Sequence, residues 1–577
     1  MGCPHLLFCV LRKKWIIKDA PSDSLVKELS AALNIDSTLS SLLIQRGISS
    51  FKEAKTYFRP SLDQLHDPFL MDQMDVAVKR IHKAISKDQK ILVYGDYDVD
   101  GTTSVALMHS FLSTQSDYVD YYLPDRYEEG YGISEQSIDF AAENGYSLII
   151  ALDCGIRANS CVEKANKNNI DFIICDHHLP GEILPPALAI LDPKKETCGY
   201  PFDELSGCGI GFKLIQGYGL KHGVPEGEIY KYLDLVAVST CADIVPIVGE
   251  NRILTYFGLR KLNQRPLPGL DALIKIAGRN GNLSVSDVVF GIAPRINAAG
   301  RMNHAKDAVQ LLLMKDGEDL GEQASILNKM NAERKLMDEQ ITEQAIQQME
   351  EHPNFKSAKS AVLYNESWHK GVIGIVASRV IEKYYRPTII LTKSKGKATG
   401  SARSVKGFNV YEAISACSEH LDQFGGHKYA AGLTMPIDNI KDFANQFEDE
   451  VRKRISPDSL KPMLSIDQKI SLTKITMDFY KIIRQMEPFG PGNPAPLFIA
   501  EKVMCKNARI VGENHLKLSL TQEGSASIDA IAFRMSTHLD AVLNNPFNIA
   551  FHIELNEYQG NQNLQLVIKD IQLSDVA

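Results

Sequence analysis

The chain has 577 residues, for which we expect about four domains at roughly 150 residues each. Its composition, 44% apolar and 23% charged with a mean hydropathy of −0.15, excludes wholly disordered, collagen-like and polytopic membrane proteins. The 63 basic and 71 acidic residues give a net charge of −8, which excludes a histone-like protein. A nucleic-acid enzyme is not excluded, because positive charge can be local and metal ions can offset acidic clusters.

The ten cysteines are scattered along the chain and form no CxxC pair, so we expect no zinc finger, redox motif or small disulfide scaffold. Scattered thiols in a large chain favour a reducing compartment. The N-terminal apolar run precedes its basic residues, the reverse of a secretory signal, and no apolar stretch reaches the ~18 residues that span a bilayer. We therefore predict a cytoplasmic protein with no membrane partner.

After an N-terminal lead segment, residues 1–70, we predict a first domain over residues 71–316. Short apolar runs alternate there with amphipathic segments of helix length, for which serine is the expected N-cap. The apolar runs are 91–94, 118–123, 148–152, 172–175 and 189–191, and the helical segments are 104–113, 134–143 and 160–168. Apolar strands separated by helices predict βαβ units and a parallel sheet that is covered on both faces.

Residues 317–351 contain no proline, and no glycine after Gly321, so we predict one long helix that connects two domains. About 30 helical residues would extend ~45 Å, which is long enough for such a connector. An ordinary amphipathic core helix explains the same segment equally well.

Residues 352–460 return to α/β character and form the next predicted domain. Its first part, from Lys356 to Val410, carries eleven basic and two acidic residues, a net charge of +9. This basic stretch is either a track for a polyanionic strand or a solvated face. Its position beside the arginine motif described below favours the track.

The remainder of the chain, residues 461–577, is β-rich. Apolar and polar residues alternate at 516–520 and 564–566, which predicts a small β-barrel or sandwich. Its aromatic residues are either stacking platforms for bases or, more often in such folds, core residues: Phe498, Phe533, Phe547 and Tyr558. The stretch 487–496, rich in proline and glycine, is predicted to be a loop or a domain junction.

Acidic residues and histidines follow the apolar segments of the first domain. Any one of the acidic residues could be explained as a solvated loop residue or a helix N-cap. They are Asp96, Asp98 and Asp100 after the first run, Asp153 after the third, Asp176, His177 and His178 after the fourth, and Asp243 after an apolar segment at 233–238. In a parallel sheet, ligands bind outside the carboxyl ends of the strands. Two carboxylates 4 Å apart repel by ~4 kcal/mol at an effective dielectric of 20, so such a cluster needs counterions.

Carboxylates mixed with imidazoles suit Mn²⁺ or Mg²⁺ better than structural zinc. Several aspartates that could bridge suggest two ions, which at a separation of ~3.5–4 Å can hold an attacking water and the phosphoryl oxygens. The reaction class predicted from the residues is therefore hydrolysis of a phosphate ester.

The sequence DYDVDG (96–101), together with DHH (176–178), resembles the DHH phosphoesterase superfamily, and the chain is most similar to its RecJ family of bacterial single-strand-specific 5′→3′ exonucleases. The further matching motifs are PDRYEEGYGIS (124–134), VAVSTCADIVPI (236–247), PRINAAGRMNHA (294–305), SWHKGVIGIVASRVIEKYYRP (367–387), GSARSVKGFNVYEA (400–413), FGGHKYAAG (424–432) and EPFGPGNPAP (487–496). They occur in the family's order over nearly the whole chain. The resemblance implies an α/β fold: a parallel-sheet DHH domain, a long helix, a smaller α/β DHHA1 domain and a C-terminal OB-fold β-barrel.

The resemblance also implies the roles of the clustered residues. The implied metal ligands are Asp98, Asp100, Asp153, His177 and Asp243. Asp96 would be either a further ligand or a hydrogen-bond acceptor in the layer of residues around the ligands. Asp153 would bridge the two ions, and His178 would contact the scissile phosphate or the attacking water. Asp176 would orient a neighbouring imidazole, so the implied catalytic set is Asp98, Asp100, Asp153, Asp176, His177, His178 and Asp243.

Substrate-binding residues are expected in three of the matching motifs. Ser401 and Arg403, with Arg301, are expected to bind a terminal 5′-phosphate, because guanidinium forks and close backbone amides suit phosphate oxygens. A surface salt bridge is the competing explanation for any single arginine. His427 is expected in a loop that contacts the substrate, and the alternative is a core histidine beside an interior glycine turn.

The function implied is a single-stranded-DNA-specific 5′→3′ exonuclease with two Mn²⁺ or Mg²⁺ ions, acting in DNA repair and recombination. The expected partner is single-stranded DNA with a 5′ end, and a single-strand-binding protein and a helicase are candidate partners. One alternative is a DHH phosphodiesterase or pyrophosphatase for short RNAs, oligonucleotides or cyclic dinucleotides, although the β-rich extension would be unnecessary for a small substrate. The other alternative is an inactive DNA-binding scaffold, which the complete set of implied ligands disfavours.

Overall fold

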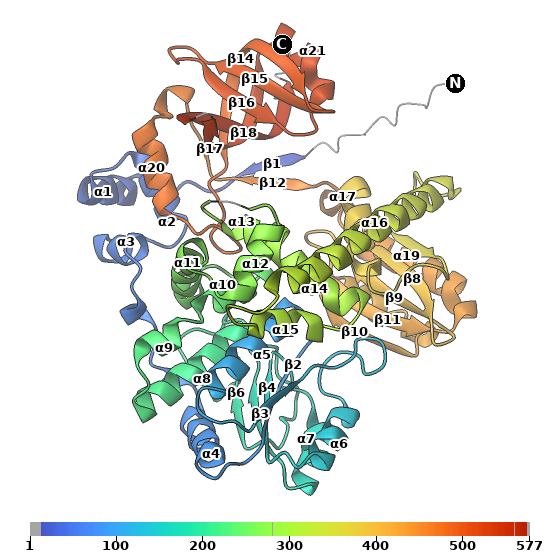
Figure 1. Ribbon diagram of the computed structural model, residues 1–577. Helices are drawn as coiled ribbons and strands as arrows, with labels where there is room; N and C mark the ends of the chain where they lie inside the picture. Colours follow the sequence, from blue (N-terminus) through green and yellow to red (C-terminus); the bar gives the residue numbers. More distant parts are fainter. Residues whose placement is uncertain (1–12, 280, 559, 574–577) are drawn as a thin grey trace. The chain divides into compact units, whose positions relative to one another are not determined.

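The computed structural model describes residues 13–279, 281–558 and 560–573 (Figure 1). The chain folds into two compact units. We call them, after their places in the sequence, the middle unit (Ser50–Ala332 with Gln485–Ala495) and the terminal unit, which holds the rest of the described chain. Within the described residues, no helix is both long enough and apolar enough to cross a membrane.

The N-terminal part of the chain belongs to both units. β1 (Lys14–Ile17) pairs in parallel with β12 (Met463–Ile466), and Trp15 Nε1 donates a hydrogen bond to Asp570 at 2.7 Å. The following helices α1 (Asp23–Leu33) and α2 (Ser37–Ile44) stay in the terminal unit, whereas α3 (Phe51–Phe58) belongs to the middle unit. The segment that precedes the first domain in sequence is therefore largely a partner of the C-terminal barrel.

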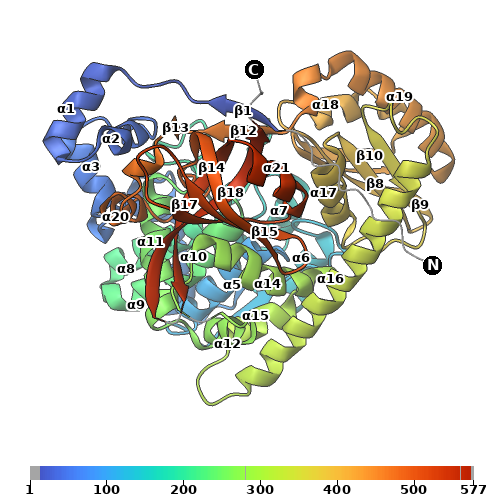
Figure 2. The ribbon, with the colours of Figure 1, turned by 90° about the horizontal axis from the view of Figure 1, so that it is seen from above.

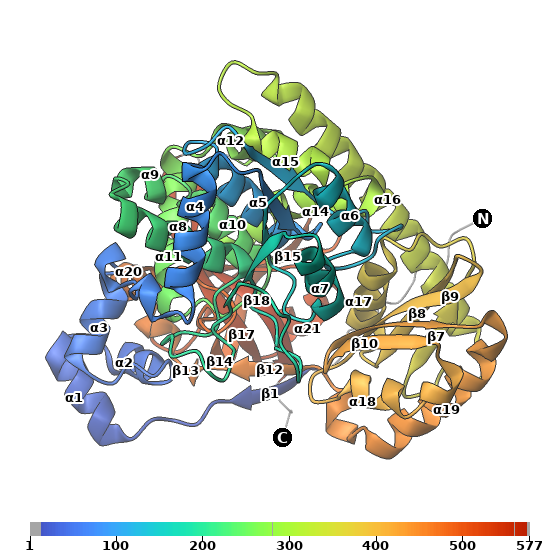
Figure 3. The ribbon, with the colours of Figure 1, turned by 90° about the horizontal axis from the view of Figure 1, so that it is seen from below.

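The middle unit is built on a five-stranded parallel sheet of order β3-β2-β4-β5-β6. Its strands are β2 (Ile91–Gly95), β3 (Val119–Tyr122), β4 (Leu148–Leu152), β5 (Asp171–Cys175) and β6 (Ala189–Leu191). All five predicted apolar runs form strands. One face packs on α4 (Met74–Ser86), α5 (Val99–Leu112) and α8 (Gly207–His222), and the other on α6 (Glu135–Glu143) and α7 (Asn159–Lys167) (Figure 3).

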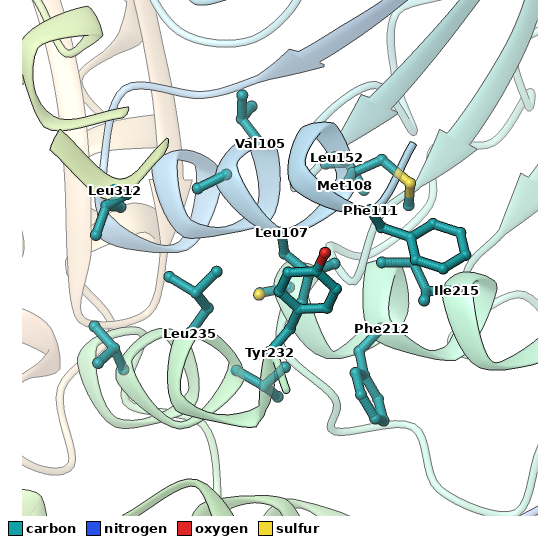
Figure 4. Packing of buried hydrophobic residues seen from close by; sticks show 14 of the residues in the cluster. Val105, Leu107, Met108, Phe111, Leu152, Phe212, Ile215, Tyr232, Leu235 and Leu312 are labelled. Atoms are coloured by element: carbon teal, nitrogen blue, oxygen red, sulfur yellow. The ribbon is translucent and has the colours of Figure 1, made fainter. Parts of the chain in front are cut away.

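The core beneath the sheet edge is made of large apolar side chains. Figure 4 shows Phe111 of α5 facing Ile215 of α8, with Leu152 at the end of β4 close by. Burying a side chain of this size contributes about 1.5–3 kcal/mol. The strand ends that carry the acidic residues are therefore supported by a rigid core.

Three local predictions were wrong. The helix predicted to begin at Ser104 begins at Val99 with Asp98 as its N-cap, so Asp100 lies in the first turn of α5. Similarly, Ala158 rather than Ser160 precedes the first turn of α7. The apolar segment before Asp243 lies in helix α10 (Leu233–Ala242), so Asp243 extends from a helix C-terminus and not from a strand.

The rest of the middle unit is helical. Its elements are η1 (Leu62–Gln64), η2 (Pro68–Leu70), α9 (Glu226–Tyr230), α11 (Gly249–Gln264), α12 (Pro268–Ile276), α13 (Val285–Asp287), the π-helical turn η3 (Val288–Ile292), α14 (Ala293–Met302) and α15 (Lys306–Leu313).

The predicted long helix is α16 (Leu320–Glu351), and it belongs to both units. Its N-terminal part buries Ala324 and Leu327 in the core of the middle unit. Its C-terminal part buries Ile341, Ala345 and Met349 in the terminal unit. Both interpretations of this segment therefore hold, because the helix continues from one core into another.

The terminal unit contains a five-stranded mixed sheet of order β10-β11-β9-β8-β7. Its strands are β7 (Ala361–Tyr364), β8 (Thr388–Ser394), β9 (Lys397–Arg403), β10 (Gln423–His427) and β11 (Ala430–Met435). One face packs on α17 (Ile373–Tyr384) and the end of α16, and the other on α18 (Val410–Ser415) and α19 (Ile440–Arg454) (Figure 2).

The C-terminal part of the terminal unit is a closed barrel, as predicted, because β17 pairs with both β18 and β14. Its elements are β13 (Gln468–Lys469), α20 (Met477–Gln485), β14 (Phe498–Val511), β15 (His515–Thr521), β16 (Ile528–Ala532), α21 (Leu539–Asn544), β17 (Phe547–Tyr558) and β18 (Asn561–Leu573). Phe498 and Phe547 are fully buried, so these two are core residues and not stacking platforms. Phe533 is 50% exposed, and the side chain of Tyr558 lies outside the described residues.

Candidate active site

Three aspartates lie where β2 leads into α5: Asp96 and Asp98 precede the helix, and Asp100 is in its first turn. Asp98 caps the helix, and its Oδ1 accepts a hydrogen bond from the Gly101 amide at 3.0 Å. The turn is tight: a Cβ on Gly101 would lie 2.3 Å from the carbonyl oxygen of Asp96. The glycine of the DYDVDG motif therefore allows the chain to fold back so that the acidic residues gather at the start of one helix.

Asp153 follows β4 in a left-handed backbone conformation, with φ of 60°. The first residue of α8, Gly207, lies directly against it: a Cβ on Gly207 would be only 2.5 Å from Asp153 Cβ. A larger residue at position 207 would displace Asp153, so this glycine sets how closely α8 approaches the site.

The side chains from the separate elements meet around His177. Its Nε2 lies 3.1 Å from an Asp153 carboxylate oxygen, 3.6 Å from one of Asp243 and 3.7 Å from one of Asp100. Two overlapping groups have ligand atoms that all lie within 4.8 Å of one another: Asp153, His177 and His178, and Asp100, His177 and Asp243. The tertiary structure therefore brings five of the predicted site residues together.

The cluster is electrostatically unfavourable by itself. Burial raises the pKa of Asp153, and the charges of Asp100 and Asp98 raise it further. Burial and the same two neighbours raise the pKa of Asp243 to about 8. Burial and the charge of Asp98 likewise raise the pKa of Asp96, which places Asp96 in the same electrostatic group.

This donor set fits divalent cations. Carboxylate oxygens with one imidazole are ligands for Mn²⁺ and Mg²⁺ rather than for structural zinc. Burial lowers the pKa of His177, which favours the neutral imidazole that can act as a ligand. Positive ions placed among these carboxylates would remove the mutual repulsion.

Asp176 holds His178. Its Oδ1 lies 2.7 Å from His178 Nδ1 and accepts the backbone amide of His177 at 2.8 Å, while its Oδ2 accepts the amide of Ile156 at 2.9 Å. Burial opposes ionisation of Asp176, but the hydrogen bond and charge of His178 bring its pKa below the usual range. The opposite ring nitrogen of His178, Nε2, lies 3.2 Å from the hydroxyl of Tyr131. These contacts agree with the orienting role expected for Asp176.

Asp100 has partners that the sequence analysis missed. Ser239 Oγ donates to its Oδ1 at 2.6 Å, and the amides of Cys208 and Gly207 donate to Oδ1 and Oδ2 at 2.8 and 2.7 Å. A helix N-terminus favours a negative charge through its free amides and its dipole. The SGCGIG sequence (206–211) is a visible helix start, but only the tertiary structure shows which carboxylate its amides bind.

The predicted phosphate-binding residues of the terminal unit lie on one face of β9. Arg403 Nη1 donates to Ser401 Oγ at 2.9 Å, and burial lowers the pKa of Arg403. Both side chains pack on the first turn of α17, where a Cβ on Gly374 would lie 2.9 Å from Arg403 Nη2 and 3.0 Å from Ser401 Oγ. A half-buried guanidinium beside a helix N-terminus is an arrangement that binds anions.

The remaining predicted substrate residues have different surroundings. His427 is exposed at the end of β10, so it is not a core histidine; it pairs with Ala430, which pairs in turn with Arg403. Arg301 lies in α14 of the middle unit, and its carbonyl accepts a hydrogen bond from Tyr127. The three predicted phosphate contacts thus come from two separate units.

The basic stretch is partly neutralised by ion pairs. The paired residues are Arg379 with Asp338 at 2.7 Å, Lys383 with Glu350 at 2.9 Å, Lys393 with Glu366 at 3.3 Å and Lys397 with Asp422 at 2.9 Å. Three of these acidic partners lie outside the stretch itself. Its net charge of +9 therefore overstates the field that this face presents to a polyanion.

Comparisons with known proteins agree with these assignments of fold. The chain matches the DHH family N-terminal domain at residues 90–240, the DHHA1 domain at 357–453 and the RecJ OB domain at 466–570. The single-stranded-DNA-specific exonuclease RecJ of Bacillus subtilis (strain 168) is 36% identical over 570 residues, covering 98% of this chain and 71% of the relative. That of Escherichia coli (strain K12) is 33% identical over 559 residues, covering 92% and 95%.

The solved structures include RecJ of Thermus thermophilus. Its complex with Mn²⁺ has a TM-score of 0.85 and 27% identity, covering 98% of this chain and 80% of that one. Its complex with Mg²⁺ has a TM-score of 0.78 and 26% identity, covering 98% and 79%.

A parallel sheet with a DHH sequence and clustered carboxylates at its carboxyl edge defines the class, a metal-dependent phosphoesterase of the DHH type. The identity to relatives over nearly the whole chain, with all three domain models in order, is more specific. The chain belongs to the RecJ family of single-stranded-DNA-specific exonucleases.

Proposed function

We propose that this chain hydrolyses single-stranded DNA from its 5′ end, in DNA repair and recombination, with two Mn²⁺ or Mg²⁺ ions bound in the middle unit. The observation that carries the proposal is the convergence of Asp100, Asp153, His177 and Asp243 within ligand distance, in a chain whose relatives are named single-stranded-DNA-specific exonucleases. The T. thermophilus relative has been solved with each of these ions.

The residues of the site have separable roles in this proposal. Asp98, Asp100, Asp153, His177 and Asp243 would hold the ions, and Asp96 belongs to the same group of interacting acids. Bound divalent ions supply an activated water and stabilise the charge on the phosphoryl oxygens. His178, held through Nδ1 by Asp176, has its Nε2 available to a phosphate oxygen in place of Tyr131.

Recognition of the 5′ end is proposed for the terminal unit. Arg403 and Ser401, at the first turn of α17, supply a guanidinium, a hydroxyl and helix amides to a terminal phosphate. Arg301 of α14, in the middle unit, and His427 at the exposed end of β10, in the terminal unit, are proposed as further contacts with the substrate. A site that binds the terminal phosphate would make the enzyme start at a 5′ end and so would determine its polarity.

The wider setting is also part of the proposal. A single-strand-binding protein and a helicase are proposed partners, since an exonuclease of this kind requires exposed single strands. A cytoplasmic location is proposed because the eight described cysteines are free thiols, as in a reducing compartment.

The decisive experiment is digestion of 5′-labelled and 3′-labelled single strands during a titration with Mn²⁺ and Mg²⁺. We expect early release of the 5′ label as a mononucleotide, no activity in a chelator, and no digestion of circular single strands. Circular strands degraded as readily as linear ones would contradict exonuclease action. Early release of the 3′ label would contradict the polarity.

The same assay separates the two alternatives. Faster turnover of a dinucleotide than of a long oligonucleotide would favour a phosphodiesterase for short substrates. Binding of single strands without hydrolysis under any metal would favour a scaffold. The intact cluster of carboxylates and imidazoles supports an enzyme over that scaffold.

A further inference from the structure

The segment that follows Asp243 has an unusual backbone conformation. Asp243 ends α10, and the next residue, Ile244, has φ of 63°, although its side chain is 68% exposed. A β-branched residue is rarely found in the left-handed region, and such a conformation persists only where the surrounding structure imposes it. Contacts further along the segment must therefore hold it.

One of these contacts is the fully buried amide of Asn251, near the start of α11. Its Nδ2 donates to the carbonyl of Pro246 at 3.0 Å and also to the carbonyl of Glu204. Pro246 lies just beyond Asp243, and Glu204 lies just before Gly207, whose amide binds Asp100. A single side chain thus connects the segment behind one acidic site residue with the segment that supports another.

The second contact comes from the loop Gln485–Ala495, which includes most of the EPFGPGNPAP motif. The amide of Ile247 donates to the carbonyl of Pro491 at 2.6 Å. Gly490 lies directly against the buried Ile247, because a Cβ there would be 2.6 Å from Ile247 Cγ1. On the other side of the contact, a Cβ on Gly492 would lie 3.1 Å from Pro246 Cβ.

The loop is itself anchored in the middle unit. Arg252 donates to the carbonyl of Glu487 at 2.8 Å and to that of Tyr57 at 2.7 Å, and its guanidinium lies 3.9 Å from the centre of the Tyr57 ring. The buried amide of Asn493 donates to the carbonyls of Met486 and Pro488 at 3.0 and 2.9 Å. This loop is therefore an ordered part of the unit that holds the acidic cluster, and not only a junction between domains.

We propose that Asn251 and the loop Gln485–Ala495 are positioning elements for Asp243: they hold residues 244–248 in one conformation and so place the Asp243 carboxylate for metal binding. The inference rests on the proposed function, since it assumes that Asp243 binds a divalent ion. Groups that orient metal ligands act through geometry, and their loss typically weakens metal binding while leaving the remaining ligands in place.

The test uses two variants of the full-length protein. Asn251→Asp keeps the size of the side chain but removes both donated hydrogen bonds and places carboxylate oxygen beside two carbonyls. Gly490→Ala adds one methyl group against Ile247, and it provides the test if a buried charge at position 251 prevents folding. Gly227→Ala, in α9 of the same unit, is the matched control because its Cβ would meet nothing within 4 Å.

Mn²⁺ binding to metal-free protein is measured by isothermal titration calorimetry, and single-strand affinity is measured in a chelator. We expect each variant to bind Mn²⁺ about tenfold more weakly, with single-strand affinity as in the unmutated protein. The Mn²⁺ concentration for half-maximal activity should rise by the same factor, and activity should largely recover at saturating Mn²⁺. Gly227→Ala should change none of these values.

The outcomes separate this inference from the proposed function. If the unmutated protein binds no Mn²⁺, the proposed function fails, and this inference fails with it. If the unmutated protein binds Mn²⁺ and Asp243→Asn weakens the binding, but Asn251→Asp and Gly490→Ala bind as tightly as the control, the inference alone is overturned. A lower stoichiometry at unchanged affinity would also overturn it, since that result indicates only a smaller folded fraction.

Discussion

The acidic cluster of the middle unit and the Arg403 site of the terminal unit have opposite charge imbalances. In the cluster, burial and mutual repulsion raise the pKa values of Asp98, Asp153 and Asp243. At β9, Arg403 is half-buried, and among the described residues it donates hydrogen bonds to a hydroxyl and a carbonyl rather than to a carboxylate. The cluster therefore holds more negative than positive charge, and the Arg403 guanidinium has no carboxylate among these hydrogen-bond partners.

This difference indicates what each region binds. The repulsion within a group of crowded carboxylates is relieved by cations, whereas a half-buried guanidinium beside a helix N-terminus is stabilised by an anion. A phosphorylated strand with metal ions supplies both. The comparison predicts that substitutions in the two regions will affect different measurements.

The largest effect is expected for Asp153→Asn. Losing the central ligand should reduce hydrolysis by about 10³-fold or more, since metal ions contribute several kcal/mol to such reactions. In a chelator the variant should melt at a higher temperature than the unmutated protein, because one repelling charge is removed. Unmutated protein should be stabilised by about 2.7 kcal/mol when Mn²⁺ is present at 100 times its dissociation constant, and the variant should lose most of this gain.

Differential scanning fluorimetry with and without Mn²⁺, beside a single-strand digestion assay, checks both parts. Retained hydrolysis in Asp153→Asn would contradict the assignment of this residue. A lower melting temperature in the chelator would contradict the argument from repulsion.

The next largest effect is expected for Ser239→Ala, which removes the 2.6 Å hydrogen bond to Asp100. We expect Mn²⁺ affinity to fall by about 10–100-fold, measured by calorimetry. The control is Thr240→Val, which also removes a buried hydroxyl from α10, but one that donates to the carbonyl of Val236 in the same helix. Equal losses in both variants would indicate a general packing effect.

A smaller and differently directed effect is expected for Arg403→Lys. The lysine keeps the charge but loses the planar fork, so the ratio of kcat/KM for 5′-phosphorylated over 5′-hydroxyl strands should fall by about tenfold, as for one charge-assisted hydrogen bond. Mn²⁺ affinity should not change. Arg452→Lys, on α19 beside Glu448, is the control and should leave the ratio unaltered. A change in Mn²⁺ affinity instead would refute the separation of the two sites.

The smallest effect is expected for the double variant Lys393→Gln and Lys397→Gln. Both lysines already pair with acidic residues, Glu366 and Asp422. We expect single-strand affinity to change less than about twofold. The slope of log affinity against log salt concentration should change by less than about one, the amount that corresponds to the loss of one phosphate contact. A larger decrease in slope would support the interpretation of the basic stretch as a binding track for the DNA strand.

Much of the fold could be predicted because it depends on local patterns. The apolar runs before Asp96, Asp153 and Asp176 each form a buried strand, and the proline-free segment forms α16. Prediction failed at the start of α5 because two local capping signals compete there. Asp98 caps α5 because its carboxylate reaches the Gly101 amide, and this capping outweighed the serine at position 104.

The site was predictable to a similar degree. The residues that carry its chemistry follow strand ends or match family motifs, so they can be found from sequence. Ser239 and Asn251 could not be found in this way, because their role depends on a carboxylate or carbonyls that are distant along the chain. In a sequence, a serine or asparagine with such a role cannot be distinguished from one without it.

The class of fold, the acidic residues and histidines of the candidate site, and the family resemblance can all be read from the sequence, since these depend on residue type and short-range order. Three features became visible only in the folded chain: Asp243 extends from a helix, residues 14–17 pair with a strand beside the barrel, and the loop Gln485–Ala495 contacts the segment behind Asp243. The physical reason is that such contacts join residues far apart in the chain, and their geometry is set by packing rather than by local preference.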